Sequence, residues 1–356
     1  MVCELLRTGF LAVKRNVTLK DIAQETGVHV STVSRALTPN ARASLSPEVV
    51  KKIREAAQAM GYRPNRLASG LRTNRTMSVG VMIPDITNML FPPIVRGVES
   101  ALEPEGYASI LVNTDNDANR ETRLFNVLRE RGVDGIIDAA VRRVDPSVEK
   151  LFEDIPVVTV NRHIEGTSVP CVVSDDVGGV NKMIDLLSKA GHKRIGHIAG
   201  PQNLSTGAVR REAFIAAMRA LGISKPSQLI VDANGYTEDE GARCADELLD
   251  RDGSITALFC ANDRLAIGAL DTLSKRGLSC PHDISVTGFN DIPFLDVIPP
   301  GLTTVQVLQF DLGRTAAEIL YKMMTSPLRR VPMATVLPVS IIERGSVAPP
   351  PARGQV

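Results

Sequence analysis

Cysteine is scarce in this sequence, and its spacing excludes two kinds of protein. The five cysteines lie between positions 3 and 280, and none forms a C-x-x-C pair. An odd and widely spread set is neither a disulfide framework nor a cysteine-based zinc site, and it predicts a reducing compartment. Long apolar runs are also missing, since none approaches the ~18 residues that a membrane span requires. The sequence therefore predicts a globular protein without disulfides or membrane spans.

Catalytic patterns are equally absent. The sequence contains no nucleophile–base arrangement, no cluster of metal-ligating residues and no phosphate-binding loop. Gly178 and Gly179 follow DDV and lack the further glycines of a nucleotide-binding fingerprint. We therefore expect a protein that is not an enzyme and that has no cofactor and no metal site.

Charge is unevenly divided along the 356 residues, a length that predicts two or three domains. Residues 1–76 carry 13 Lys and Arg against 5 Asp and Glu, whereas the remaining residues carry 28 against 35. The net charge of +1 therefore conceals a basic head and an acidic body. A basic head predicts a polyanionic partner for that part of the chain alone.

Three short helical patterns follow residues 1–16, which we expect to be a disordered extension. Thr18 stands in position to cap the first pattern, and Gly27 ends it. The second pattern covers about residues 30–37. The third begins with Ser46 as N-cap, followed by proline, and ends at a glycine. Three short helices with one tight turn predict a small, all-α DNA-binding head.

The second helical pattern has one apolar and one polar face. Val33 and Leu37 are four residues apart, so we expect them to pack on the first helix. The polar face then points outward, as in a helix-turn-helix, whose second helix enters the major groove of DNA. Val30 offers an apolar contact to a thymine methyl group, and Ser31 offers a hydrogen bond to a base or phosphate. Arg35 can contact guanine bidentately or a phosphate.

From residue 77 onward the pattern changes to apolar strands that alternate with helices. MSVGVMIP, YASILVNTD, GIIDAA and PVVTVN form one series, and RIGHIAG, QLIVDAN, ALFCAND and ISVTGFND form a second. Continuous apolar strands separated by helices predict parallel sheets covered on both faces. The two series predict an α/β sensor of two doubly wound parallel-sheet lobes with a cleft between them. We expect the proline-rich residues 346–356 to be disordered.

Polar side chains follow the predicted strands, which is where ligands of paired α/β lobes bind. Amides and charged groups around one aromatic ring suit a polyhydroxylated ligand such as a sugar. Some of these residues have structural alternatives: Asp263 and Asp291 as helix caps, Asp85 as a loop former, and Arg162 in a surface ion pair. The candidate effector-binding residues are Asp85, Asn88, Asn161, Arg162, Thr206, Arg210, Tyr236, Asn262, Asp263 and Asn290.

Eight segments occur in an order that resembles a known family. They are TLKDIAQETGV, STVSRAL, GYRPNRLASGL, DGII, GHKRIGHIAGP, ANDRLAIGAL, DISVTGFND and PPGLTTV, and they span about residues 17–345. Together they resemble the lactose-repressor/galactose-repressor family of bacterial transcription factors. The resemblance implies a helix-turn-helix head, a hinge helix and a sensor of the periplasmic-binding-protein type.

The resemblance also implies roles for residues of the head. Thr32 and Ser34 match phosphate contacts, with an alternative as helix hydroxyls that are satisfied locally. His29 stands where the family usually has a capping serine, and we expect it to contact phosphate instead. The positions that match DNA contacts are Thr18, Val30, Ser31, Thr32, Ser34 and Arg35.

The hinge matches the family residue by residue from Asn65 to Leu71. A helix this short is far below the ~12 residues that are marginal in water, so we expect it to form only when two copies pair on DNA. Leu71 then corresponds to the apolar wedge that the family inserts into the minor groove. The alternative is that Leu67 and Leu71 pack on the sensor. The hinge residues expected to contact DNA are Asn65, Arg66, Ala68 and Leu71.

In the sensor, the resemblance assigns the ligand-holding arginine to Arg210 and the aromatic wall to Tyr236. Asn290 stands where many members have aspartate. A neutral amide repels an anion less than a carboxylate does. The substitution therefore leaves room for a sugar acid or a sugar phosphate.

The expected function is that of a sequence-specific DNA-binding transcriptional regulator, a repressor, controlled by a small sugar-like effector between the sensor lobes. We expect a homodimer on a pseudo-palindromic operator, because the family's tetramer-forming leucine tail is not seen. The expected location is the bacterial cytoplasm, in association with the nucleoid. The expected domains are residues 1–16 (extension), 17–63 (DNA-binding head), 64–76 (hinge), 77–345 (sensor) and 346–356 (tail).

Two alternatives remain. Within the family, the alternative is a regulator that needs a corepressor or a phosphocarrier partner to bind DNA. In a different class, the alternative is a periplasmic-type sugar-binding protein. The basic helical head disfavours the second alternative, and so do Glu4 and Arg7, which interrupt the N-terminal apolar stretch that a signal peptide would need.

Overall fold

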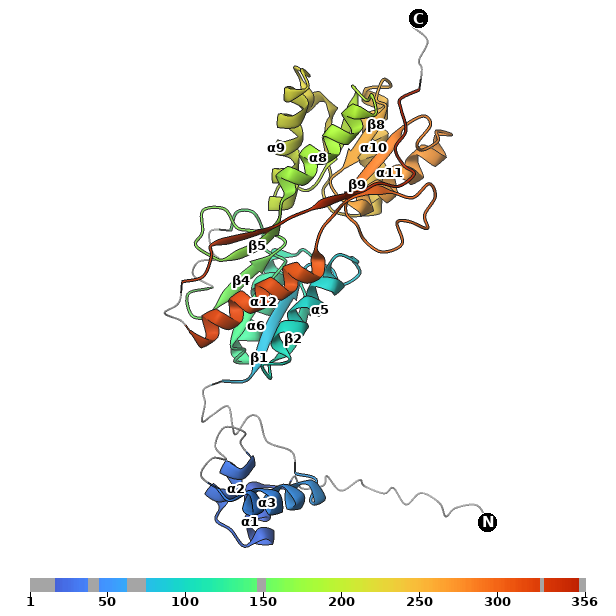
Figure 1. Ribbon diagram of the computed structural model, residues 1–356. Helices are drawn as coiled ribbons and strands as arrows, with labels where there is room; N and C mark the ends of the chain where they lie inside the picture. Colours follow the sequence, from blue (N-terminus) through green and yellow to red (C-terminus); the bar gives the residue numbers. More distant parts are fainter. Residues whose placement is uncertain (1–16, 38–44, 63–74, 146–151, 327–329, 352–356) are drawn as a thin grey trace, which may run out of the picture. The chain divides into compact units, whose positions relative to one another are not determined.

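A computed structural model describes residues 17–37, 45–62, 75–145, 152–326 and 330–351. The chain divides into two compact units, one up to residue 74 and one from residue 75 onward, termed the head and the sensor (Figure 1). This boundary lies within the expected hinge, residues 64–76. The expected extension and nearly all of the expected hinge lie outside the described residues.

The head contains the three helices expected from the sequence. Thr18 caps the first, because its hydroxyl accepts a hydrogen bond from the Asp21 amide while the Asp21 carboxylate accepts one from the Thr18 amide. Gly27 ends this helix in the left-handed conformation, with φ of 69°. The helices are α1 (Leu19–Thr26), α2 (Val30–Leu37) and α3 (Pro47–Ala59).

The core of the head takes one fully buried, branched side chain from each helix. These are Ile22 from α1, Val33 from α2 and Ile53 from α3. The second buried residue of α2 is Ala36, and Leu37, which was expected there, is only half-buried. Val33 and Ala36, three positions apart, therefore face the core, whereas the expected pair, Val33 and Leu37, is four positions apart. Residues at either spacing lie on the same side of a helix.

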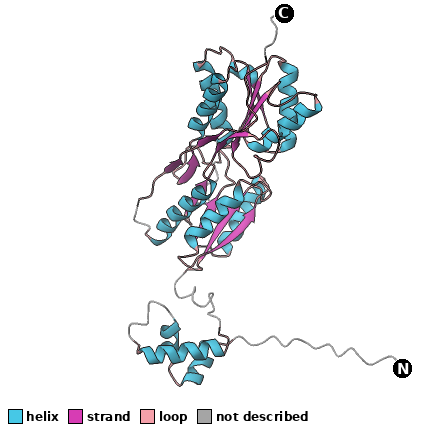
Figure 2. Ribbon diagram, turned by 45° about the vertical axis from the view of Figure 1, so that its right-hand side comes forward, coloured by secondary structure: helices cyan, strands magenta, loops and turns pink. Residues whose placement is uncertain are grey.

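The sensor contains two six-stranded sheets with helices on both faces, which confirms the expected pair of doubly wound lobes (Figure 2). The sheet of the first lobe is parallel and has the order β11-β5-β4-β3-β1-β2. Its strands are β1 (Ser78–Ile83), β2 (Ala108–Asn113), β3 (Gly135–Asp138), β4 (Val157–Val160), β5 (Cys171–Ser174) and β11 (Ala334–Leu337). Its helices are α5 (Phe91–Leu102), α6 (Ala118–Glu130) and α12 (Gln309–Thr325).

The sheet of the second lobe has the order β12-β10-β9-β8-β6-β7 and is parallel except for one antiparallel edge strand, β12. The chain enters β12 directly from the first lobe without a crossover helix, so this strand runs away from the cleft. The strands are β6 (Ile195–Ala199), β7 (Ile230–Asp232), β8 (Ala257–Cys260), β9 (Ser285–Asn290), β10 (Thr303–Gln306) and β12 (Ser340–Ile342). The helices are α8 (Asp176–Lys189), α9 (Ser205–Ala220), α10 (Glu238–Arg251) and α11 (Asp263–Lys275).

The chain passes between the lobes three times: after β5, after β10, and between β11 and β12. The first and third passages run side by side, since β5 pairs with β11 and the Asp175 amide donates to the Leu337 carbonyl at 2.9 Å. Lys182 of α8 also donates to the Val339 carbonyl at 2.7 Å. These connections place the carboxyl ends of both sets of parallel strands opposite each other.

Residues 346–351 belong to the fold, so the expectation of disorder from residue 346 onward is wrong for them. The buried Ser346 hydroxyl donates to the Val286 carbonyl at 2.6 Å and accepts from the Thr303 amide at 2.8 Å. The Ala348 carbonyl lies 2.9 Å from a ring nitrogen of His192. These contacts use the Ser346 hydroxyl and the backbone of the tail, and composition does not reveal them. Residues 352–356 lie outside the described part of the chain.

Candidate nucleic-acid interface and effector cleft

Helix α2 presents the residues that were expected to reach DNA. Ser31 and Arg35 are exposed, and Val30, Thr32 and Ser34 are half-buried. Nε of Arg35 lies 3.4 Å from the Ser31 carbonyl oxygen and donates to it, which keeps the guanidinium on the same side of the helix. The helix thus offers one surface that combines hydroxyl groups with an arginine, as a recognition helix requires.

His29 caps helix α2 with its imidazole ring. Nδ1 accepts a hydrogen bond from the Ser31 amide at 3.3 Å and lies 2.8 Å from the Ser31 hydroxyl. A nitrogen that accepts from an amide is unprotonated, so this arrangement places the ring proton on Nε2. His29 therefore does what the family's serine does, which sequence reasoning had not expected. The Nε2–H group of this exposed residue is the one that can reach a phosphate.

Other expected DNA contacts are only partly placed by the structure. Thr18 is exposed, but its hydroxyl already serves the capping box of α1. The described helices of the head carry five Lys and Arg against four Asp and Glu, so the basic excess comes from the segments that flank them. The expected hinge contacts Asn65, Arg66, Ala68 and Leu71 lie outside the described residues.

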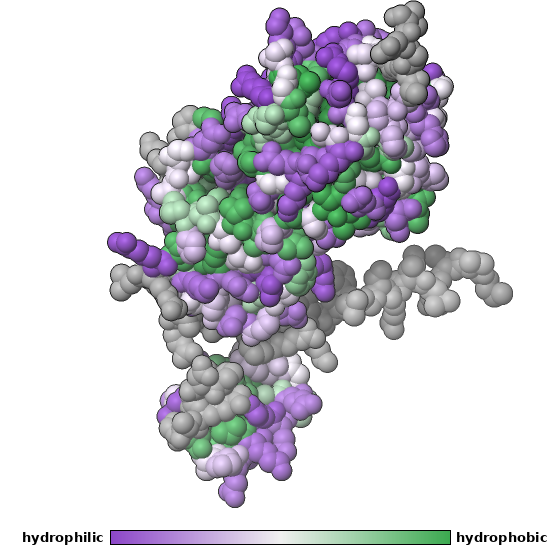
Figure 3. Space-filling view, turned by 45° about the horizontal axis from the view of Figure 1, so that its top comes forward, coloured by the Kyte–Doolittle hydropathy of each residue, from purple (hydrophilic) through white to green (hydrophobic). Residues whose placement is uncertain are grey.

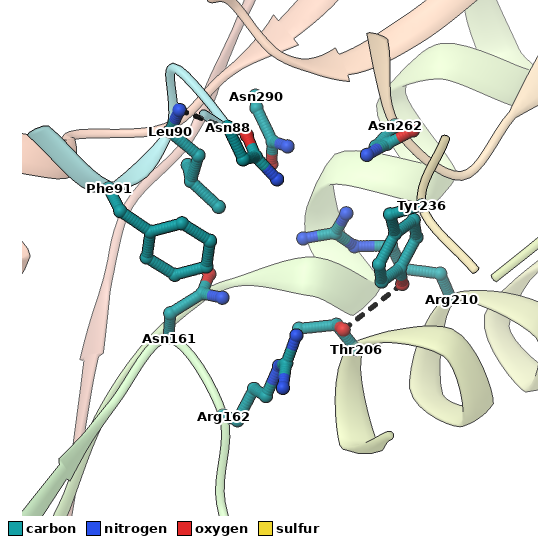
Figure 4. Close-up of a pocket in the computed structure, with 10 residues that line it drawn as sticks. All are labelled: Asn88, Leu90, Phe91, Asn161, Arg162, Thr206, Arg210, Tyr236, Asn262 and Asn290. Carbon is teal, nitrogen blue, oxygen red and sulfur yellow. Dashed lines mark hydrogen bonds between the residues drawn. The ribbon is translucent and has the colours of Figure 1, made fainter. Parts of the chain in front are cut away.

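A polar pocket lies where the carboxyl ends of strands from both lobes meet (Figure 4). This deep pocket measures about 20 Å³, room for about one water molecule. An outer cavity of about 170 Å³ shares Asn88, Phe91, Arg162 and Tyr236 with it. Leu90 also lines the deep pocket. Of the ten expected effector contacts, eight line it: Asn88, Asn161, Arg162, Thr206, Arg210, Tyr236, Asn262 and Asn290.

Arg210, on α9, is held in the wall of the deep pocket by a buried ion pair. Nε and Nη2 donate to Oδ1 of Asp176, in the first turn of α8, at 3.1 and 2.8 Å. Nη1 donates to the Ala261 carbonyl at 2.7 Å, and the guanidinium carbon lies 3.7 Å from the centroid of the Phe289 ring. All these partners belong to the second lobe, so the pair orients Arg210 without joining the lobes.

Arg162 enters the same pocket from the first lobe, two residues after β4. It is buried, so the alternative of a surface ion pair is wrong. Nη1 donates to the Ala140 carbonyl at 3.1 Å and Nη2 to Oδ1 of Asn116 at 3.4 Å, whereas Nε has no partner among the described residues. Burial lowers the pKa of Arg162, yet a guanidinium keeps its charge in proteins.

Two carboxyl groups lie near Arg162 but outside the lining of the pocket. Asp138 ends β3, is buried, and accepts a hydrogen bond from the Ala140 amide at 2.7 Å. Burial raises the pKa of Asp138 to about 7. Burial and the neighbouring Asp138 raise the pKa of Glu121, in the first turn of α6, to about 8. Both groups interact electrostatically with the Arg162 guanidinium, but neither forms an ion pair with it among the described contacts.

Three asparagines bring amide groups to the ends of strands. Asn161 and Asn290 have positive φ values of 65° and 120°, a backbone region where asparagine is enriched. Oδ1 of the buried Asn290 has no hydrogen-bond partner among the described residues. Asn262 is the N-cap of α11, because its Oδ1 accepts from the Leu265 amide at 2.9 Å. Asn290 lines the deep pocket, and a buried acceptor without a hydrogen-bond donor is costly.

Apolar and aromatic surfaces complete the deep pocket. The Tyr236 hydroxyl lies 3.0 Å from that of Thr206, in the first turn of α9, and burial raises the pKa of Tyr236. Leu90 and Phe91, at the start of α5, line the opposite side (Figure 4). An amide-rich pocket with such surfaces can bind a ligand that has both hydroxyl groups and C–H faces.

Asp85, on the loop after β1, lines only the outer cavity. Its Oδ1 accepts from the Thr87 amide at 2.9 Å and from the Thr87 hydroxyl at 2.6 Å, which is the loop-forming role. Its Oδ2 pairs with Nη1 of Arg264 on α11 at 3.0 Å. Arg264 also pairs with Glu238 through two hydrogen bonds, of 2.8 and 2.7 Å. The Asp85–Arg264 pair therefore joins the two lobes.

Asp263 lines neither the deep pocket nor the outer cavity. It is fully buried in the first turn of α11, where its carboxylate accepts from a backbone amide and from the Thr304 hydroxyl. Burial raises the pKa of Asp263 to about 7. Neither aspartate of the capping alternative caps a helix, since Asn262 caps α11 and Asp291 pairs with Arg344 at 2.8 Å. Asp263 supports the wall of the cleft from behind.

Sequence reasoning missed Leu90, Phe91 and Asp176. The first two lie in NMLFPP, where apolar residues directly precede the prolines that begin α5, and that position signals a loop returning toward the sheet. Asp176 lies in SDDV beside Asp175, which is the N-cap of α8. An acidic residue in the first turn of a helix is expected to interact favourably with the helix dipole. Asp176 fits that ordinary role, so nothing in the sequence reveals its pair with Arg210.

Some features are absent from the part of the chain that the structure covers. No three or more His, Cys, Asp or Glu side chains gather there in a way that could hold a metal ion. No helix there combines the length and the apolar character needed to cross a membrane. The cysteines described are free thiols: Cys171, Cys244, Cys260 and Cys280.

Two family models match the chain. Residues 18–65 match the bacterial regulatory proteins of the lacI family, and residues 184–347 match a periplasmic binding protein-like domain. Catabolite control protein A of Priestia megaterium is 32% identical over 311 residues, which cover 87% of this chain and 93% of that protein. The HTH-type transcriptional regulator GalS of Salmonella typhimurium is 30% identical, with 93% of this chain and 97% of that protein covered.

A solved structure agrees with this assignment. The transcriptional regulator CelR–cellobiose complex has a TM-score of 0.70 and 28% identity, and the match covers 93% of this chain and 100% of that one. The shared length includes both the helical head and the two-lobed sensor whose cleft is lined by amides and arginines. This chain therefore belongs to the lacI family of bacterial regulatory proteins and is a DNA-binding transcriptional regulator, not an enzyme.

Proposed function

We propose that the protein is a repressor whose affinity for its operator is set by a sugar-derived effector in the cleft. One observation carries the proposal: two buried polar atoms of the cleft, Nε of Arg162 and Oδ1 of Asn290, have no partner among the described residues. Such atoms favour a ligand that supplies the missing hydrogen bonds. Arg162 belongs to the first lobe and Asn290 to the second, so one ligand that binds both responds to the arrangement of the lobes.

Effector binding acts on DNA through that arrangement. A ligand shifts the balance between two arrangements only if it binds them with different affinities. The connections that must adjust include the three chain passages, the Asp85–Arg264 pair, and the hydrogen bonds that the Arg143 and His163 amides donate to Asn203 and Ser205 of the second lobe. The first lobe begins at residue 75, directly after the hinge segment, so its movement changes the constraint on the hinge and the head.

In the head, we assign base contacts to the exposed side of α2 and phosphate contacts to the residues around it. The exposure of Ser31, Arg35 and His29 supports this division. Among the described residues, the base contacts are Val30, Ser31 and Arg35, and the phosphate contacts are Thr18, His29, Thr32 and Ser34.

We further propose a homodimer on a pseudo-palindromic operator, since paired recognition helices read two half-sites. Apolar residues gather in the middle of the sensor face shown in Figure 3, and clustered apolar surface marks interaction sites. Such a dimer acts in the bacterial cytoplasm, and its association with the nucleoid is part of the proposal. Exposed large apolar side chains of the two lobes include Ile86, Met89, Leu111, Phe294 and Val297.

The test starts with the full-length protein and a random DNA library. Repeated selection should converge on a two-fold symmetric sequence, and fluorescence anisotropy should then measure its affinity. Arg35→Ala should lower the preference for this sequence over unrelated DNA, because Arg35 reads bases, whereas Arg54→Ala on the exposed side of α3 should not. Selection without convergence would falsify the proposed function. An unchanged preference in Arg35→Ala would remove Arg35 from the base-reading set.

A further inference from the structure

The lining of the deep pocket contains two arginines and no acidic residue. Arg210 is neutralised by its buried pair with Asp176, at 2.8 Å. Arg162 has no ion-pair partner among the described residues, and it donates its described hydrogen bonds to the Ala140 carbonyl and to Oδ1 of Asn116. A buried charge without a counter-charge is unfavourable. We propose that the counter-charge is the effector itself, a sugar acid whose carboxylate sits between Arg162 and Arg210.

The two guanidinium groups are placed to share one anion. Both point toward the middle of the pocket, Arg162 from the first lobe and Arg210 from the second (Figure 4). Each guanidinium has five N–H donors. The described partners of Arg162 use two of them and those of Arg210 use three, so both groups keep donors for a ligand. A carboxylate that bridges them offsets their mutual repulsion and links the lobes.

The nearby acidic groups do not take this place. Asp138 and Glu121 interact electrostatically with Arg162, but both lie outside the lining and neither forms an ion pair with it among the described contacts. Asp263 also lies outside the lining, and its carboxylate is occupied by a backbone amide and the Thr304 hydroxyl. In the outer cavity, Asp85 is paired with Arg264 at 3.0 Å. The cleft therefore offers a ligand more donors than carboxylate acceptors.

The volumes of the deep pocket and the outer cavity suit different parts of such a ligand. The deep pocket, at about 20 Å³, admits one small polar group but not a sugar ring. The outer cavity, at about 170 Å³, is below the ~300–1,000 Å³ of sites for drug-sized molecules and suits a monosaccharide. Arg162, Tyr236 and Phe91 line both spaces and lie where the ring joins the carboxylate. Arg142 also lines the outer cavity, so the charges of the cleft alone do not exclude a phosphate, and the experiment below compares the two anions directly.

This inference rests on the proposed function, because it names the ligand class of the same cleft. The test uses isothermal titration calorimetry of the full-length protein with matched pairs: D-glucuronate and D-glucose, D-galacturonate and D-galactose, and D-gluconate with D-glucitol. At least one acid should bind roughly 10–100-fold more tightly than its neutral partner, as expected for charge-assisted hydrogen bonds. Glucose 6-phosphate serves as the phosphate probe.

Variants show whether Arg162 is responsible. Arg162→Gln should bring the acid-to-neutral affinity ratio close to one, and Arg162→Lys should keep part of it. Arg211→Gln, which breaks a pair with Asp232 outside the cleft, should leave the ratio unchanged. A folding defect would weaken both members of a pair and leave their ratio intact, so the ratio separates charge recognition from stability.

Each contrary result has a distinct meaning. Tighter binding of neutral sugars or of glucose 6-phosphate would overturn the carboxylate and leave the proposed regulator standing. Failure of all acids to bind at millimolar concentration would overturn the sugar-acid inference as well. A ratio that survives in Arg162→Gln would place the carboxylate elsewhere. The proposed function is judged separately, by selection of an operator with the same protein preparation.

Discussion

The carboxylate of Asp85 accepts a hydrogen bond from Nη1 of Arg264 at 3.0 Å, and these two residues belong to different lobes. Asp85→Asn should weaken this link and lower effector affinity by up to about fivefold, because partly exposed ion pairs contribute about 0–1 kcal/mol. The effect should shrink in 1 M salt, which screens the pair. Calorimetry at two salt concentrations measures it. Asp232→Asn, which breaks a pair within the second lobe, is the control and should leave affinity unchanged.

The buried pair of Arg210 and Asp176 makes Arg210→Ala a double perturbation. The variant should lose effector binding, and it should lose about 3–5 kcal/mol of stability because Asp176 is left buried without its partner. The double variant Arg210→Ala/Asp176→Ala should recover part of the stability but none of the effector binding. Chemical denaturation and calorimetry measure the two quantities. Equal stability of the single and double variants would show that Asp176, left buried without its partner, does not destabilise the fold.

The buried carboxyl groups should make the sensor less stable as pH rises. In the folded chain, the pKa values of Asp138, Asp263 and Glu121 are raised by burial to about 7, about 7 and about 8. In the unfolded chain these three carboxyl groups are already ionised above pH 6.5, so the folded state binds more protons than the unfolded state in this range. Each rise in pH therefore favours unfolding. We expect a loss of roughly 1–3 kcal/mol between pH 6.5 and 8.5, measured by urea denaturation.

Two variants locate the source of this dependence. Glu121→Gln and Asp138→Asn should each flatten the profile, and Asp263 should maintain the remaining slope. Asp271→Asn, an exposed acid of α11, should leave the profile as it is. Burial lowers the pKa of His197 to about 3, so His197 gives a small opposite slope near pH 6.5, where histidine ionises in the unfolded chain, and none at the upper end of the range. A profile that is flat in the unmodified protein would refute buried, protonated carboxyl groups.

His29 offers a test of capping against DNA contact. His29→Ala should destabilise the head by about 0.5–2 kcal/mol, since the Ser31 amide loses its acceptor. His29→Ser should restore the cap and thus the stability. If Nε2 of His29 also reaches a phosphate, His29→Ser should still bind selected DNA more weakly at a fixed salt concentration, because the variant lacks that donor. Unfolding curves and anisotropy titrations separate the two roles.

Strand-end reasoning named most of the polar residues that line the deep pocket, because polar residues after parallel strands gather at one edge of a sheet. Arg162, Tyr236 and Asn290 were found in this way. Asp263 was misplaced because it follows the lining residue Asn262 by one position. One step along a helix rotates a side chain by about 100°, which here turns Asp263 away from the cleft.

Other differences arise from contacts between distant parts of the chain. Asp176 meets Arg210 from a helix that begins 29 residues earlier, a pairing that one sequence cannot reveal. Ala36 replaces Leu37 in the head because the rotation of a two-turn helix is set by its neighbours. The residues around Ser346 join the second lobe through backbone and hydroxyl bonds, which composition does not encode.

The crossing pattern of the chain has a consequence for synthesis. The sheet of the first lobe receives its edge strand, β11, only at Ala334–Leu337, and helix α12 precedes it by a few residues. The sheet of the second lobe likewise lacks its edge strand until β12, Ser340–Ile342, has been synthesised. A nascent chain on the ribosome therefore holds two incomplete sheets until nearly all of it has been translated. Premature termination upstream of β11 would leave both sheets with unpaired edges, so truncated products should be targets for chaperones and proteases.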